Sequence, residues 1–210
     1  MNTLGAILKE LKHHAPFTAF GALTGIVLVF VFRNIPDKVS HELFYVFHPA
    51  HVLLSALATA AMYKKHAFSK NSPLKNIFFL FLIGYLGAIA VATISDSLMP
   101  YLSEVVLKMP NPETHLGFVE KFWLISTMAI LGIIIAYFNP NTKFPHSAHV
   151  MISTWASLFH VLMALGKSVS AITFLVLFIF LFLAVWVPCC VSDIIFPLLF
   201  TPNKDRSCCH

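Results

Sequence analysis

Two stretches of this chain, residues 77–94 and 168–192, contain no charged side chain. About 20 predominantly apolar residues in a helix can cross the roughly 30 Å hydrocarbon core of a bilayer, so both stretches have transmembrane length. These two runs indicate an integral membrane protein. Four shorter apolar runs complete a set of six, at residues 17–32, 49–63, 122–138 and 147–166.

The overall composition agrees with a membrane environment. Hydrophobic residues make up 58% of the 210 residues and charged residues only 11%, whereas soluble domains are about 25% charged. Inside lipid the backbone must satisfy its own hydrogen bonds, and the six runs lack the alternating pattern of barrel strands. We therefore expect an all-α, polytopic membrane protein with six transmembrane helices.

The basic residues predict how these helices are oriented. An even number of spans puts both chain ends and the second and fourth loops on one side of the membrane. The positive-inside rule makes that side the cytoplasm of a cell (inner or plasma) membrane. The net charge of +5 then requires no nucleic-acid partner, since anionic headgroups suffice. The predicted cytoplasmic side carries the larger share of the 14 basic residues, namely Lys9, Lys12, Lys64, Lys65, Lys70, Lys75, Lys143, Lys204 and Arg206.

Two polar motifs occur twice in the chain, in the same order. An H-x-A-H-V-φ-φ-S pattern, where φ is hydrophobic, begins at His48 and again at His146, an offset of 98 (146 − 48). An S-D-x-x-x-P pattern begins at Ser95 and again at Ser192, an offset of 97 (192 − 95). Recurrence of polar motifs at nearly constant spacing indicates an internal duplication.

The duplication predicts two three-helix repeats, residues 1–107 and residues 108–210, the second ending in a short cytoplasmic tail. A weaker match supports the same division, because His14 and His115 each precede a span and are followed by Phe three residues later. Each repeat has an odd number of spans, so the two copies must be inverted relative to one another. Inverted repeats are a recurring architecture of secondary transporters.

The predicted topology gathers polar residues from both repeats at each face of the membrane. Residues three apart on a helix share one face, so a His-x-x-His motif aims two imidazoles at a common point. A carboxylate and a third imidazole can complete the coordination of a metal ion. The candidate metal ligands are His48, His51, Asp96 and His115 at the outer face, and His14, His146, His149 and Asp193 at the inner face.

The residue types narrow the choice of metal. Imidazole with carboxylate suits Mn, Zn, Fe, Co or Ni, and the absence of thiolate argues against Cu(I). An aspartate embedded in a membrane costs roughly 2.5–3.5 kcal/mol on insertion scales, so two at equivalent positions point to function. Ser95 and Ser192, which precede the two aspartates, are expected to hold their carboxylates by hydrogen bonds.

Other polar residues and prolines receive structural interpretations. His41 and His160 are interpreted as residues at the membrane interface whose imidazole rings contact water. Pro49 lies near a predicted helix start, where proline is tolerated, whereas Pro188 is expected to kink its helix or break it before Cys189. The four cysteines form two vicinal pairs, which are expected to be free thiols because adjacent cysteines rarely bridge and the cytosol is reducing.

The leading hypothesis is a transporter or exporter of a divalent transition-metal ion rather than an enzyme. Protons are the candidate coupling ion, since imidazole titrates near neutral pH, and a homodimer is compatible with so thin a bundle. One alternative is a membrane-embedded metalloenzyme, either a zinc hydrolase or a di-iron protein. Another is a b-type haem electron-transfer protein, although the predicted topology puts His51 and His149 on opposite sides of the membrane.

Overall fold

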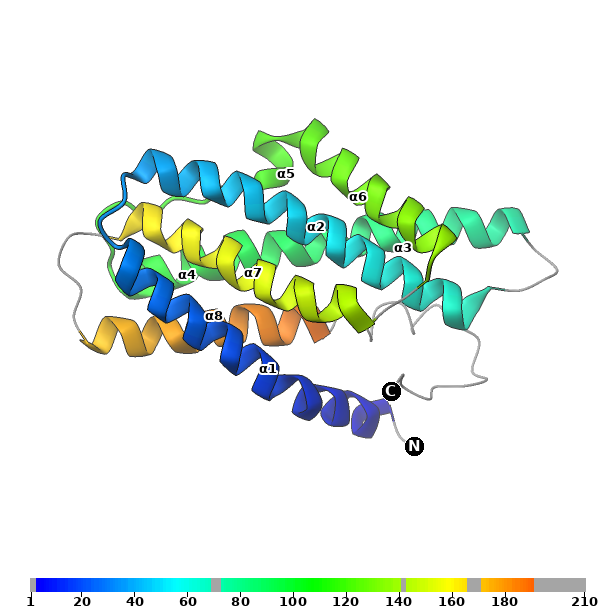
Figure 1. Ribbon diagram of the computed structural model, residues 1–210, viewed down its shortest axis with the longest axis horizontal. Coiled ribbons are helices and arrows are strands. Elements are labelled where there is room, and N and C mark those ends of the chain that lie inside the picture. Colours follow the sequence, from blue (N-terminus) through cyan, green and yellow to red (C-terminus); the bar gives the residue numbers. More distant parts are fainter. Residues whose placement is uncertain (1–2, 69–72, 141–142, 166–170, 191–210) are drawn as a thin grey trace.

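The computed structural model describes residues 3–68, 73–140, 143–165 and 171–190, and all regular structure there is helical (Figure 1). The prediction of an all-α chain is therefore confirmed for the described residues. A single rod is formed by α3, the π-helical turn η1 and α4 in direct succession. The elements are α1 (Thr3–Phe32), α2 (Asp37–Ala67), α3 (Pro73–Thr93), η1 (Ile94–Leu98), α4 (Met99–Val106), α5 (Gly117–Glu120), α6 (Phe122–Phe138), α7 (Lys143–Ala164) and α8 (Ala171–Cys190).

Helix α2 lies at the centre of the bundle and packs against α3, α6 and α7. Helices α2 and α7 run antiparallel: the ring of Phe44 lies 5.5 Å from that of His160, and further along α2 the ring of His51 lies 5.2 Å from that of His149. Helix α1 packs against α7 and α8, and α3 packs against α6. The helical rod that contains η1 and α4 also contacts α7 and α8.

By length and composition, two helical segments suffice to cross a membrane, Asp37–Lys65 and Pro73–Val106. Four shorter apolar helical segments accompany them within the described residues, and all six overlap the apolar runs of the sequence. Many large apolar side chains on the outside of these helices are exposed, including Phe78, Trp123 and Ile172. The shorter segments are Thr18–Phe32, Phe122–Phe138, Ala148–Ala164 and Ile172–Pro188.

Helix α2 begins well before the apolar run that identified it. It starts at Asp37, directly after Pro36, so Pro49 lies inside the helix and not near its start. The hydropathy pattern missed these first turns because they carry exposed charges such as Lys38. At 1.5 Å per residue, His51 lies roughly 20 Å from the helix start, close to its middle.

Helix α8 likewise continues through a proline. Pro188 lies within the helix, which the structure describes as far as Cys190, so there is no break before Cys189.

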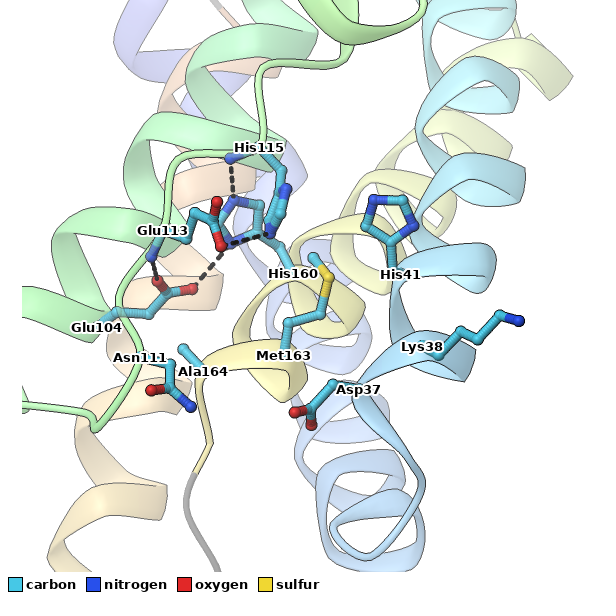
Figure 2. Close-up of a pocket in the computed structure, with 10 residues that line it drawn as sticks. All are labelled: Asp37, Lys38, His41, Glu104, Asn111, Glu113, His115, His160, Met163 and Ala164. Carbon is cyan, nitrogen blue, oxygen red and sulfur yellow. Dashed lines mark hydrogen bonds and ion pairs between the residues drawn. The ribbon is translucent and has the colours of Figure 1, made fainter.

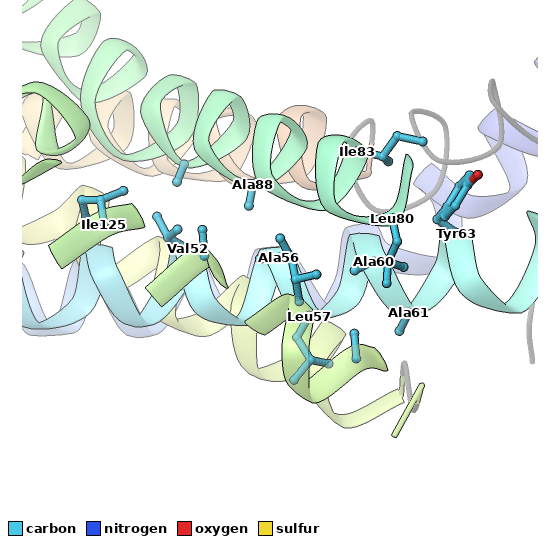
Figure 3. Packing of buried hydrophobic residues seen from close by; sticks show 14 residues of the cluster. Val52, Ala56, Leu57, Ala60, Ala61, Tyr63, Leu80, Ile83, Ala88 and Ile125 are labelled. Carbon is cyan, nitrogen blue, oxygen red and sulfur yellow. The ribbon is translucent and has the colours of Figure 1, made fainter. Parts of the chain in front are cut away.

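One side of α2 is built from small residues, which allow close approach by α3 and α6 (Figure 3). Ala56 and Ala60 are fully buried there. Gly132 of α6 lies against the α2 backbone, and a Cβ at this position would lie 2.3 Å from the carbonyl oxygen of Leu53. This tight packing fixes the rotation of α2, so that its histidines face η1 and α7 on the other side.

Candidate metal centre

The S-D-x-x-x-P motif of the first repeat forms a π-helical turn. The Ile94 carbonyl accepts a hydrogen bond from the Met99 N–H, five residues further on. An ordinary α-helix would direct the Asp96 carbonyl to the N–H of residue 100, but that residue is proline and has none. The Met99 N–H, which the Ser95 carbonyl would accept in an α-helix, goes to Ile94, and the Ser95 carbonyl accepts a hydrogen bond from the Ser157 hydroxyl of α7 at 2.9 Å. Pro100 offers no N–H to either register, which favours an irregular turn here. π-Helical turns are often found at functional sites.

The carboxylate of Asp96 accepts four hydrogen bonds in the protein interior. Its Oδ2 lies 3.0 Å from His48 Nδ1 and 2.7 Å from His51 Nδ1. Its Oδ1 accepts from the Ser95 hydroxyl at 2.7 Å and from the Ser153 hydroxyl at 2.9 Å. All five side chains are at most 1% exposed. The expectation that Ser95 holds this carboxylate is confirmed.

These hydrogen bonds determine which nitrogens remain for a ligand. An ionised carboxylate only accepts hydrogen bonds, so Nδ1 of both His48 and His51 carries the proton and donates. Each ring then presents its Nε2, and the Nε2 of His51 is buried without a hydrogen-bond partner among the described residues. A carboxylate that holds an imidazole through Nδ1 while Nε2 binds metal is a common arrangement in metalloproteins. Asp96 has the geometry of such a holding group, although the sequence suggested it as a ligand.

A third imidazole adjoins this group. His149 of α7 is fully buried, and its ring lies 5.2 Å from the ring of His51, tilted by 50°. The expectation that these two histidines lie on opposite sides of the membrane is wrong. Because α2 begins at Asp37, His51 falls in mid-helix, where the antiparallel α7 brings His149 to the same level. We name His48, His51, Asp96 and His149 the central cluster.

His115, predicted to join His48 and His51, has different carboxylate partners. It lies between α4 and α5, with its Nδ1 3.5 Å from a Glu120 oxygen and its Nε2 3.9 Å from a Glu113 oxygen. Its ring is 5.4 Å from that of His41 in an edge-to-face arrangement. The Phe44 ring, stacked on His48 at 5.0 Å, lies 6.4 Å from His115. The predicted outer group is therefore split into two neighbouring groups.

A buried pair lies beside His115. His160 Nε2 accepts the His115 backbone N–H at 3.3 Å, so its Nδ1 is protonated and donates to Glu104 at 2.8 Å. Glu104 is fully buried and His160 is 1% exposed, so the interpretation of His160 as an interfacial residue is wrong. Glu104 also accepts the backbone N–H of Glu113. An acidic residue so deep in an apolar rod is stabilised by these partners.

A cavity of about 470 Å³ opens at this end of the bundle, where α2 begins and α7 ends (Figure 2). Its lining combines acidic groups and imidazoles with one lysine, and includes no member of the central cluster. Within the described chain, one atom each from His41, His115 and Glu120 lie within 4.8 Å of one another, a spacing that could hold a metal ion. The cavity is lined by Asp37, Lys38, His41, Glu104, Asn111, Glu113, His115, His160, Met163 and Ala164.

The predicted inner group is only partly described. His14 lies in α1 and His146 in α7, but their side chains are outside what the structure describes, and Asp193 lies outside the described residues altogether. No role was predicted from the sequence for Ser153, Glu104 or Glu120. For Ser153 a signal was present, because it follows His149 by four residues and shares its helix face.

Comparisons of the chain with protein-family models, with curated proteins and with solved structures found no match. The function is therefore inferred from the chemistry of the residues themselves.

Proposed function

We propose that this chain is an integral membrane transporter of a divalent transition-metal ion, which it binds at the central cluster. The observation that carries the proposal is the pair of buried imidazoles held by one carboxylate, with a third imidazole from another helix beside them. Three histidines and no thiolate suit Zn, Mn, Fe, Co or Ni. The bound ion is the cargo, and each imidazole must be unprotonated at the nitrogen that binds it.

The pattern of helix contacts supports two related repeats. Suppose that α1, α2 and α3 correspond to α6, α7 and α8. The contact of α2 with α6 then corresponds to that of α7 with α1, and the contact of α2 with α3 to that of α7 with α8. The contact of α3 with α6 likewise corresponds to that of α8 with α1. The contact between α2 and α7 is its own counterpart. His51 and His149, which occupy equivalent motif positions, meet in that contact. Equivalent groups meeting between inverted halves would give a carrier two exchangeable states around one site.

The proposed membrane arrangement has six spans with both termini in the cytoplasm. The exposed apolar side chains of α3, α6 and α8 would then face lipid. The cavity beside His115 would open to the outside. Labelling by a membrane-impermeant maleimide tests this: a single cysteine replacing Glu113, which is 76% exposed, should react in intact cells. Labelling only after the membrane is opened would reverse the proposed orientation.

Burial of the central cluster favours transport over catalysis. All of its members are at most 1% exposed, and the cavity is lined by other residues. A hydrolase needs room for its substrate at the metal, whereas a carrier must enclose its ion in an intermediate state. Aromatic rings connect the cavity to the cluster, since the ring of Phe44 contacts that of His160, a cavity residue held by Glu104, and stacks on that of His48.

The decisive experiment measures metal content and transport in the same preparations. Wild-type protein, the His51→Ala/His149→Ala double variant and a Thr127→Val control are purified, analysed for metals and reconstituted into vesicles containing a metal-sensitive dye. Thr127 is exposed on α6, far in sequence from the cluster, so its variant should behave as wild type. We expect the double variant to lose the ion of the central cluster and metal uptake. Equal metal content in all three proteins would refute the proposal.

Two further readouts separate the alternatives. Wild-type protein that binds metal but turns over lipid without moving ions would be a metalloenzyme. A Soret band in the purified protein would indicate haem ligation instead.

A further inference from the structure

The cavity end of the bundle contains a second set of metal-ligating atoms, separate from the central cluster. His41 comes from the exposed beginning of α2, His115 from the segment before α5, and Glu120 from the end of α5. His115 and Glu120 are only partly buried, with 14% and 35% of their side chains exposed. His41 and His115 line the cavity, so an ion in the cavity could reach the group from there.

The distances are close to those of a real coordination sphere. Metal–ligand bonds of 2.0–2.1 Å place the ligand atoms of a tetrahedral zinc site about 3.4 Å apart. His115 Nδ1 and Glu120 Oε1 are already 3.5 Å apart. All three ligand atoms lie within 4.8 Å of one another, so a shift of about 1.4 Å would bring the widest pair to tetrahedral spacing. His41, on the partly exposed surface of α2, can make this movement by a change of rotamer.

The neighbours of the group hold its carboxylate in position. The Tyr45 hydroxyl, one turn after His41 on α2, donates a hydrogen bond to Glu120 Oε2. This leaves Oε1 directed at His115. A hydrogen bond to the outer oxygen of a ligating carboxylate is a usual means of orienting it. The second carboxylate near His115, that of Glu113, is by contrast 76% exposed.

We propose that His41, His115 and Glu120 form a second binding site for a divalent transition-metal ion, at the mouth of the cavity. Two imidazoles and one carboxylate leave coordination positions open for water, as expected of a site that exchanges its ion readily. The site shares no ligand with the central cluster, and its carboxylate is Glu120 rather than Asp96. Binding at the mouth therefore does not depend on the proposed transport function, although it would serve that function by collecting ions beside the path inward.

The test is a Co²⁺ titration of the purified full-length protein, followed by the visible absorption of bound cobalt. Wild-type protein should bind two ions, and His41→Ala or Glu120→Gln should bind one. Glu42→Gln is the matched control, because Glu42 adjoins His41 in sequence but is exposed and belongs to neither group. It should keep both ions. Tyr45→Phe, which removes only the bond that orients Glu120, should weaken the mouth site about tenfold.

The His51→Ala/His149→Ala double variant makes this test independent of the central cluster. It should retain one cobalt ion, and that ion should be lost when His41→Ala is added. Loss of the central ion alone would leave the mouth site standing even if transport were disproved. If His41→Ala and Glu120→Gln both bind as much cobalt as Glu42→Gln, the three residues form only an ion pair and the proposal is wrong.

Discussion

Replacing Asp96 with asparagine would remove the charge of the central cluster while leaving its shape intact. Asparagine has one oxygen and one NH₂ group, where aspartate has two oxygens. Serine hydroxyls can accept as well as donate, so the NH₂ group will face Ser95 and Ser153. The remaining oxygen will stay with His48 and His51, whose Nδ1 atoms can only donate in this arrangement. The fold should therefore tolerate the substitution.

The expected loss of metal affinity follows from the two hydrogen bonds that change character. A hydrogen bond to a charged group contributes about 1.5–3 kcal/mol and a neutral one about 0.5–1.5 kcal/mol. The substitution therefore weakens the hydrogen bond that orients each imidazole by roughly 1 kcal/mol, and the two bonds together by roughly 2 kcal/mol. Since 1.4 kcal/mol is a factor of ten, Kd should rise about 30-fold. Partners of metal-binding histidines typically contribute 10- to 100-fold.

The assay is a zinc competition titration in detergent, performed in the His41→Ala background so that only the central ion is followed. Ser153→Ala serves as the control, because it removes a donor to Oδ1 but touches neither imidazole of His48 and His51. Its effect on Kd should be smaller than that of Asp96→Asn. An unchanged Kd for Asp96→Asn would refute the holding role. A loss far beyond 100-fold would make Asp96 a direct ligand, as the sequence first suggested.

Three other substitutions test the packing around the cluster. Gly132→Ala places a Cβ 2.3 Å from the Leu53 carbonyl oxygen, so it should lower the free energy of unfolding by about 1–3 kcal/mol, measured by thermal unfolding in detergent. Pro100→Ala restores the missing N–H, and the π-turn should relax toward an α-helix with weaker metal binding in the same titration. Gly117→Ala puts a Cβ 2.4 Å from His48 Nε2, and the displaced ring should weaken metal binding about tenfold. Wild-type stability or affinity in any of these variants would contradict the packing described.

The helical fold was predictable because it depends on local properties of the sequence. Uncharged apolar runs such as 77–94 identified helices without reference to the rest of the chain. The start of α2 was not predictable in this way, because its first turns carry Asp37, Lys38 and Glu42. Such residues look like a loop until the packing of the remaining helix shows that they extend it.

Part of the candidate site was also predictable. The spacing of His48 and His51 indicated a shared helix face, and both imidazoles do reach one carboxylate oxygen. The choice of carboxylate followed from a motif in which a serine precedes Asp96. The placement of His115 was not predictable, since it lies outside any long helix, and a change of partner there requires only a small change in the loop.

The sequence by itself determined that this chain forms apolar helices and that histidines and an aspartate recur at matched positions, because run length, helical spacing and repetition are properties of the chain alone. Only the tertiary structure decided that His51 and His149 are neighbours and that Asp96 serves two imidazoles at once. The physical reason is the antiparallel alignment of α2 and α7. In that alignment Ser153 and Ser157 of α7 donate hydrogen bonds to Asp96 and to the Ser95 carbonyl, which joins α7 to the turn that carries the shared carboxylate.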